Sequence, residues 1–184
     1  RDASIYVFHA DTEGLNFRRA FKAAGFYLSG TCIWKKQSLV LGRSPYQWQH
    51  EPILFGWKLG GKHMWYSDRK QSTIWEYDRP KKNDMHPTMK PVELVAYPIR
   101  NSSMSNCIIL DPFGGSGSTM IACEQTGRIC RTIELDEKYA DVIVHRYIEF
   151  VGSAEDVCVI RDGKKIKYSE LMKEGDMHDA VDLP

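Results

Sequence analysis

The sequence has no apolar run long enough to cross a membrane, and its N-terminus shows no basic stretch followed by an apolar one. A membrane-spanning helix needs about 20 apolar residues, so we expect no membrane span and no secretory signal. The five cysteines are scattered and form no Cys-x-x-Cys pair, which argues against a disulfide framework and a zinc site. These absences favour a cytoplasmic globular protein without a bound metal.

Two common nucleotide-binding patterns are also missing around the glycine-rich segment 111–117. A phosphate-binding loop ends in Gly-Lys-Ser/Thr, but here Gly117 is followed directly by Ser118. A dinucleotide fingerprint needs a third glycine, and Met120 stands where that glycine belongs. The segment therefore fits neither class of site.

Length and composition are those of one globular domain, with 42% hydrophobic and 27% charged residues among 184. The net charge of +1 hides an uneven distribution, because residues 34–90 hold 11 Lys or Arg against 5 Asp or Glu, and residues 134–184 hold 7 against 13. The basic segment also contains all five tryptophans. Individually we expect the tryptophans in the core, but the segment as a whole suits a nucleic-acid surface.

Strand-like and helix-like patterns alternate along the chain, which predicts an α/β fold with a largely parallel sheet. Residues 27–34 and 51–57 look like a hairpin joined by a polar loop over 35–50, and 60–85 look like an excursion over the surface. The other expected strands are 4–8, 107–110, 129–133 and 157–160, and the expected helices are 15–24, 92–99, 118–126 and 137–150.

What the sequence does have is a strand that ends in an acid and a glycine-rich turn. The apolar run 107–110 is followed by Asp111-Pro112-Phe113-Gly114-Gly115-Ser116-Gly117, and the next strand-like run ends at Glu134. Glycines let a backbone approach a ligand closely, and the helix behind them offers free N–H groups. The spacing to Glu134 is close to that of a ribose-binding acid, which predicts a nucleotide-like cofactor. Asp136, two residues further on, is expected to cap the following helix instead.

Three motifs in this order resemble the amino-methylating DNA methyltransferases of the permuted β type, which use S-adenosylmethionine. They are residues 86–91 (His-Pro-Thr-Met-Lys-Pro), the turn 111–117, and Ile133-Glu134-Leu135-Asp136 with Tyr139. The resemblance extends over the whole chain, including 33–35 and 50–53. It implies a Rossmann-like methyltransferase sheet, mostly parallel with an antiparallel hairpin, in a single domain over 1–184. Residues 35–85 would be target-recognition loops that face DNA, and 173–184 an acidic tail.

The resemblance implies roles for individual residues. Glu134 would accept hydrogen bonds from both ribose hydroxyls, because a carboxylate matches a cis-diol. Lys90 and Thr88 would meet the amino-acid end of S-adenosylmethionine, and the turn would form the floor beneath it. The cofactor residues expected are Thr88, Lys90, Asp111, Phe113, Gly114, Gly115, Ser116, Gly117 and Glu134. The DNA contacts expected are Lys35, Lys36, Arg43, Trp48, Arg69 and Lys70.

One family motif is missing from the 184 residues. The catalytic segment, an acid, Asn or Ser followed by Pro-Pro and an aromatic, is found nowhere in the sequence. In the family it lies on a central strand between the strand ending at Asp111 and the strand at 4–8, so we expect an incomplete sheet and no catalytic residue in this chain. The chain alone should then be inactive and need a complementing N-terminal segment, or form a homodimer.

The expected reaction of the intact enzyme is transfer of a methyl group to an exocyclic amine of a base in double-stranded DNA, with N6 of adenine favoured over N4 of cytosine. The alternative is a non-catalytic nucleic-acid-binding module that keeps the methyltransferase fold.

Overall fold

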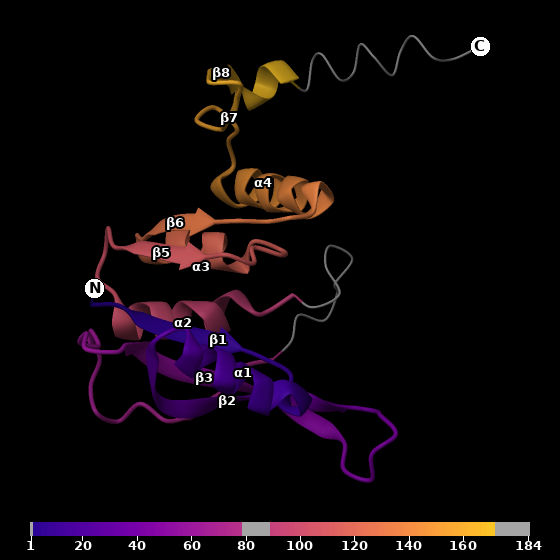
Figure 1. Cartoon of the computed structure of the whole chain (residues 1–184). Coiled ribbons are helices and arrows are strands. Elements are labelled where there is room, and N and C mark those ends of the chain that lie inside the picture. The colour runs from indigo at the N-terminus through magenta and orange to yellow at the C-terminus, as the bar shows by residue number, and fades with distance from the viewer. Residues whose placement is uncertain (1, 79–88, 172–184) are drawn as a thin grey trace.

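The computed structural model describes residues 2–78 and 89–171, which form two sheets, their helices and a C-terminal hairpin (Figure 1). The larger sheet has the order β1-β3-β2-β4. Strand β3 is antiparallel to both β1 and β2, and β4 is parallel to β2. Its strands are β1 (Ser4–Phe8), β2 (Phe26–Val40), β3 (Trp48–Lys58) and β4 (Ile74–Glu76). A short 3-10 turn (Asp11–Glu13) and helix α1 (Gly14–Ala23) connect β1 to β2.

The second half of the chain builds a parallel β-α-β unit. Strands β5 (Ile108–Asp111) and β6 (Ile129–Thr132) are parallel, and helix α3 (Ser118–Thr126) connects them. Helix α2 (Val92–Ser102) precedes this unit and α4 (Glu137–Val151) follows it. The antiparallel pair β7 (Cys158–Arg161) and β8 (Lys164–Lys167) lies beyond α4. Strands β1, β5 and β6 run in the same direction, so their carboxyl ends lie at one edge (Figure 1).

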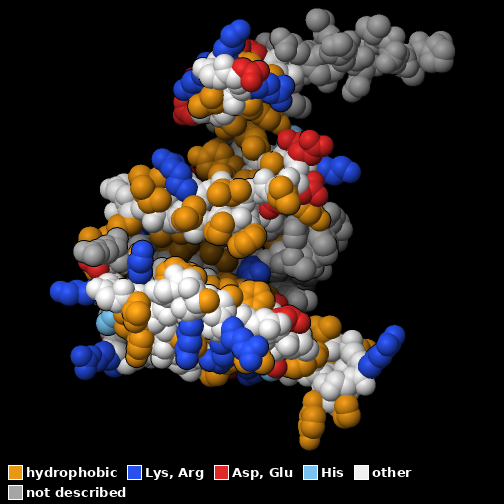
Figure 2. Space-filling view, viewed as in Figure 1, with side chains coloured by type: hydrophobic (Ala, Val, Ile, Leu, Met, Phe, Trp, Pro, Cys, Tyr) orange, Lys and Arg blue, Asp and Glu red, His pale blue; other side chains and the backbone are white. Residues whose placement is uncertain are grey.

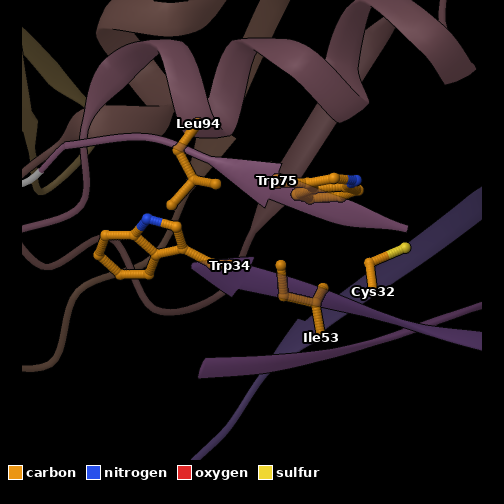
Figure 3. Close-up of a cluster of buried hydrophobic side chains, with 5 residues drawn as sticks. All are labelled: Cys32, Trp34, Ile53, Trp75 and Leu94. Atoms are coloured by element: carbon orange, nitrogen blue, oxygen red, sulfur yellow. The ribbon is translucent and has the colours of Figure 1, made fainter. Parts of the chain in front are cut away.

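The core lies between the larger sheet and α2. Trp34, Trp75 and Ile53 of the sheet pack with Leu94 of α2, and Cys32 completes the cluster (Figure 3). A second cluster joins the other face of α2 to α3 and consists of Ala96, Ile99, Ala122 and Cys123. Helix α2 therefore holds the larger sheet and the β5–β6 unit together. No helix in the described ranges is long and apolar enough to span a membrane.

Several element boundaries differ from the sequence expectation. Strand β2 continues to Val40, so Lys35 and Lys36 lie in a strand and not in the expected loop. The reason is visible at Lys36, which lies two residues after Trp34 on the same buried face of the strand and pairs with Glu51 (Nζ to Oε1, 3.4 Å).

Two further elements were missed. Strand β4 lies within the expected surface excursion, because Trp75 is buried against the core. Strand β8 pairs with β7 across the turn at Asp162 and Gly163, whereas only a strand over 157–160 was expected there. Helix α2 also continues beyond its expected end at 99, to Ser102.

Candidate functional site

The glycine-rich turn joins β5 to α3 and is fixed by Asp111. The Oδ1 atom of Asp111 accepts a hydrogen bond from the Phe113 N–H (3.1 Å), and its Oδ2 accepts one from Thr119 Oγ1 (2.5 Å). The N–H of Gly114 donates to the carbonyl of Ile133 (2.9 Å), which ties the turn to the neighbouring chain segment. Asp111 therefore organises the backbone around the site.

The glycines of the turn are required for different reasons. A Cβ atom on Gly114 would lie 2.5 Å from Thr132 Oγ1 and 2.8 Å from Ile143 Cδ1, so close packing excludes a side chain there. Gly115 and Gly117 have φ angles of 54° and 77°, in the left-handed region that favours glycine. The turn is thus built to pass close beneath β6 and α4.

This packing makes Gly114→Ala a measurable test of the turn. Because a Cβ atom has no room at residue 114, we expect the substitution to lower the free energy of unfolding by about 1–3 kcal/mol. Urea denaturation followed by circular dichroism measures the difference. Gly30→Ala is the matched control, since no atom lies within 4 Å of its Cβ position. Equal midpoints for the two variants would contradict the packing described for the turn.

Glu134 follows β6 and turns its carboxylate toward the glycine turn. Its Oε2 accepts a hydrogen bond from the Gly115 N–H (2.6 Å), and its Oε1 accepts from the N–H groups of Leu135 (2.9 Å) and Asp136 (3.1 Å). Asp136 caps α4 instead, accepting from the Lys138 N–H (2.9 Å), which confirms the expectation for that residue. A carboxylate therefore stands beside the turn at the carboxyl edge of the sheet.

The segment that contains Lys90 reaches the same region. Its carbonyl accepts a hydrogen bond from Ser118 Oγ at the start of α3 (2.8 Å), and its Nζ lies 5.1 Å from the ring centroid of Phe8 at the end of β1. The Phe113 ring is 86% exposed at the turn. Thr88 lies outside the described residues. The structure thus places the Lys90 segment against the start of α3 through a hydrogen bond, and it places the exposed Phe113 ring in the turn itself.

Arg146 of α4 holds the glycine turn through hydrogen bonds, and the sequence did not predict this role. Its Nη1 donates to the carbonyl of Ser116 (2.6 Å) and lies within hydrogen-bonding distance of the hydroxyls of Ser116 (3.2 Å) and Ser118 (3.3 Å). Burial lowers the pKa of Arg146 below its ordinary value. Its position three residues after buried Ile143 placed it on the packed face of the helix, which was the available clue.

The residues expected to contact DNA fall into two groups. Lys35 pairs with Glu76 (2.8 Å), and Lys36 is buried, with its ammonium 5.0 Å from the ring centroid of Trp34. Burial of Lys36 argues against the phosphate contact that the sequence suggested. The other five side chains lie at the surface: Lys35, Arg43, Trp48, Arg69 and Lys70.

One face of the β5–β6 pair is uncovered in the described residues. Ile109 and Cys130 pack against the α2–α3 cluster, whereas Ile108 and Leu110, which alternate with them, are 63% and 67% exposed. Hydrophobic side chains gather over this part of the molecule (Figure 2). Strand β1 is the end strand of the larger sheet, and β5 pairs only with β6 among the described strands. An exposed apolar strand of this kind is typical of a surface that another segment covers.

The fold of the chain is similar to that of solved DNA methyltransferase structures. The chain superposes on M1.HpyAVI in its SAM complex with a TM-score of 0.68 and 24% identity, over 78% of this chain and 73% of that one. The cytosine-N4-specific DNA methyltransferase PvuII gives 0.63 and 19%, over 78% and 62%. The expected α/β, Rossmann-like methyltransferase fold, with parallel strands and an antiparallel hairpin, is confirmed.

The chain belongs to the N6/N4 DNA methylase family, which it matches over residues 1–145. It is 30% identical to the methylase YubD of Escherichia coli (strain K12) over 155 residues, 76% of this chain and 59% of YubD. It is 28% identical to the type II methyltransferase M.Cfr9I of Citrobacter freundii over 169 residues, 82% of this chain and 53% of M.Cfr9I. The chain thus spans less than two thirds of the length of these relatives.

Proposed function

We propose that this chain binds S-adenosylmethionine between the glycine turn and Glu134 and supplies the cofactor-binding part of a DNA amino-methyltransferase. The observation that carries the proposal is the carboxylate of Glu134 beside the Gly115 N–H (2.6 Å). A carboxylate only accepts hydrogen bonds, so it matches the two hydroxyl donors of a ribose diol. The two hydroxyls of a ribose in the site would donate their hydrogen bonds to this carboxylate.

Other parts of the cofactor have matching partners nearby. The Lys90 ammonium would bind the cofactor carboxylate, with Thr88 proposed beside it. Phe113 offers an exposed apolar ring, and the backbone of Gly114, Gly115, Ser116 and Gly117, which Asp111 holds in place, would form the floor. The bound cofactor would supply an activated methyl group, and these side chains would orient it. The SAM complex of M1.HpyAVI supports the choice of ligand.

The acceptor of the methyl group would be an exocyclic amine of a base in double-stranded DNA, adenine N6 or cytosine N4. The oxygens that bind such an amine in the family come from a strand with the acid, Asn or Ser-Pro-Pro-aromatic motif, which these 184 residues lack. We propose that this strand comes from a segment outside them and pairs between β1 and β5, and that the rest of that segment covers Ile108 and Leu110. A second copy of the chain is the other candidate to cover this face. We place the site of action in the cytoplasm as part of this proposal.

A labelled-transfer assay tests the proposal. The chain, a second polypeptide that carries the corresponding strand of M.Cfr9I, and their mixture are each incubated with duplex DNA and S-adenosylmethionine labelled at the methyl group. If only the mixture transfers the methyl group, the result supports a site that this chain and the added strand form together. Mass spectrometry of the nucleosides identifies the methylated base. Transfer by the chain alone would contradict it.

DNA binding through exposed cations predicts a specific salt dependence. Each phosphate contact contributes about one unit to the slope of log K against log salt concentration. We expect the double variant Arg69→Ala/Lys70→Ala to lower that slope by about two, as measured by fluorescence anisotropy with a labelled duplex. Arg19→Ala/Lys22→Ala on α1 removes the same charge from another surface and should leave the slope unchanged. Equal slopes for the two double variants would remove Arg69 and Lys70 from the interface.

The absence of the catalytic motif also favours the non-catalytic nucleic-acid-binding module as a second candidate. Such a module would bind duplex DNA with the same salt dependence but would not bind S-adenosylmethionine. Calorimetric titration of the cofactor into the folded chain therefore distinguishes the two.

A further inference from the structure

The β2–β3 hairpin extends well beyond the rest of the larger sheet (Figure 1). The tip, residues 41–47, carries two of the most exposed hydrophobic side chains described, Leu41 at 84% and Tyr46 at 89%. Leu39 and Val40 at its base are also half exposed. Hydrophobic side chains at the end of this hairpin stand free in the space-filling view (Figure 2). Exposed apolar groups in such a protruding position indicate a contact surface.

The tip is held in shape by hydrogen bonds of its own. Gln47 accepts from the Gly42 N–H through Oε1 (2.6 Å) and donates through Nε2 to the carbonyl of Ser44 (2.5 Å). Gln49 donates to the carbonyl of Lys36 on the opposite strand (3.1 Å). Leu41 and Tyr46 are therefore presented by an ordered loop, which lowers the entropy lost when they bind a partner.

The charge of the tip indicates which partner it fits. Arg43 lies between Leu41 and Tyr46 in the sequence and is the only charged residue among residues 37–50. No acidic side chain stands near it in the sequence to repel a phosphate. A cation flanked by apolar and aromatic groups matches a polyanion whose bases stack, which is nucleic acid.

The tip also lies at the edge of the molecule that carries the proposed cofactor site. Strands β1 and β2 are both antiparallel to β3, so they are parallel to each other. Strand β1 runs in the same direction as β5 and β6, so the end of β2 lies at the edge where Asp111 and Glu134 stand (Figure 1). The tip and the proposed cofactor site therefore lie at the same edge of the molecule.

We propose that the tip enters duplex DNA as a wedge, with Leu41 and Tyr46 occupying the space opened beside an extruded base and Arg43 contacting the phosphates. This inference rests on the proposed function. Apolar side chains inserted between base steps unstack them, and an aromatic ring recovers stacking with the exposed bases. A wedge of this kind would stabilise the duplex in the state that base methylation requires.

Binding to paired and mismatched duplexes of one sequence tests the proposal. A mismatch lowers the cost of opening the helix, so the intact chain should bind the mismatched duplex about tenfold more tightly than the paired one. In the double variant Leu41→Ala/Tyr46→Ala this preference should fall to about one, whereas Tyr46→Phe should retain it. The control Arg69→Ala/Lys70→Ala should weaken both complexes equally and keep the ratio.

Several outcomes would overturn the wedge. One is a ratio near one for the unaltered chain, and another is an unchanged ratio for Leu41→Ala/Tyr46→Ala. A dimer seen by light scattering that this variant dissolves, with the ratio unchanged, would assign the tip to self-association. Thermal denaturation of the variant checks its fold, and its cofactor affinity, expected to equal that of the unaltered chain, reports separately on the proposed function.

Discussion

Replacement of Glu134 by alanine is expected to weaken binding of S-adenosylmethionine at least about 100-fold, because two charge-assisted hydrogen bonds to the ribose are lost at about 1.5 kcal/mol each. Isothermal titration calorimetry measures the change. Glu134→Gln keeps the shape of the side chain but loses its charge. Its affinity for S-adenosylmethionine should lie between that of the unaltered chain and that of Glu134→Ala.

Glu137→Ala is the matched control for this experiment. Glu137 is an exposed carboxylate three residues further along, in the first turn of α4. Its removal changes the net charge equally and should leave the cofactor affinity within about twofold, since Glu137 is exposed to solvent and has no proposed contact with the cofactor. If Glu134→Ala binds the cofactor as well as Glu137→Ala does, Glu134 is not the ribose-binding acid.

Trp34→Ala is expected to lower the free energy of unfolding by about 3–5 kcal/mol, a large share of the stability of a typical domain. Trp34 is 2% exposed at the centre of the sheet–α2 cluster, and its Nε1 donates to the carbonyl of Tyr77 (2.8 Å). The substitution leaves a cavity, an unpaired carbonyl and a buried Lys36 without the ring beneath it. Urea denaturation followed by circular dichroism measures the loss.

Trp48→Ala provides the comparison within the same hairpin. Trp48 is 38% exposed at the start of β3, so we expect a loss below about 1 kcal/mol. The two variants separate core tryptophans from surface ones in the basic segment. Similar denaturation midpoints for Trp34→Ala and Trp48→Ala would contradict the burial assigned to Trp34.

The cofactor site could be predicted well because its signals are local. A strand, a glycine turn and a helix that follow one another within about twenty residues are fixed by short-range sequence patterns. Asp111, Gly115 and Glu134 therefore came together where the motifs placed them. Asp136 was assigned correctly as a helix cap for the same reason.

What the sequence did not reveal depends on contacts between distant segments. Strand β4 exists because Trp75 is buried against Trp34, a pairing that no local pattern encodes. Lys36 appears to any sequence scan as a surface cation, and only the register of β2 against β3 brings Glu51 to it. Arg146 reaches back 30 residues to Ser116. Tertiary packing decided each of these positions.

The described residues fold into two parts, the larger sheet and the β5–β6 unit, which helix α2 joins. Helix α2 connects the sheet that presents the hairpin tip to the unit that holds the glycine turn, because its two faces pack on different clusters. A strand added between β1 and β5 would join the same two parts through backbone hydrogen bonds. We therefore expect the catalytic segment to stabilise the fold as well as complete the site.

A crystal structure of the chain, from crystals grown with S-adenosylmethionine, most directly tests whether the cofactor binds between the glycine turn and Glu134. We predict density for the nucleoside beside residues 113–117, with both ribose hydroxyls within about 3.2 Å of the Glu134 carboxylate oxygens. A nucleoside bound elsewhere, or a Glu134 side chain turned away from a ligand seated on the glycine turn, would contradict it.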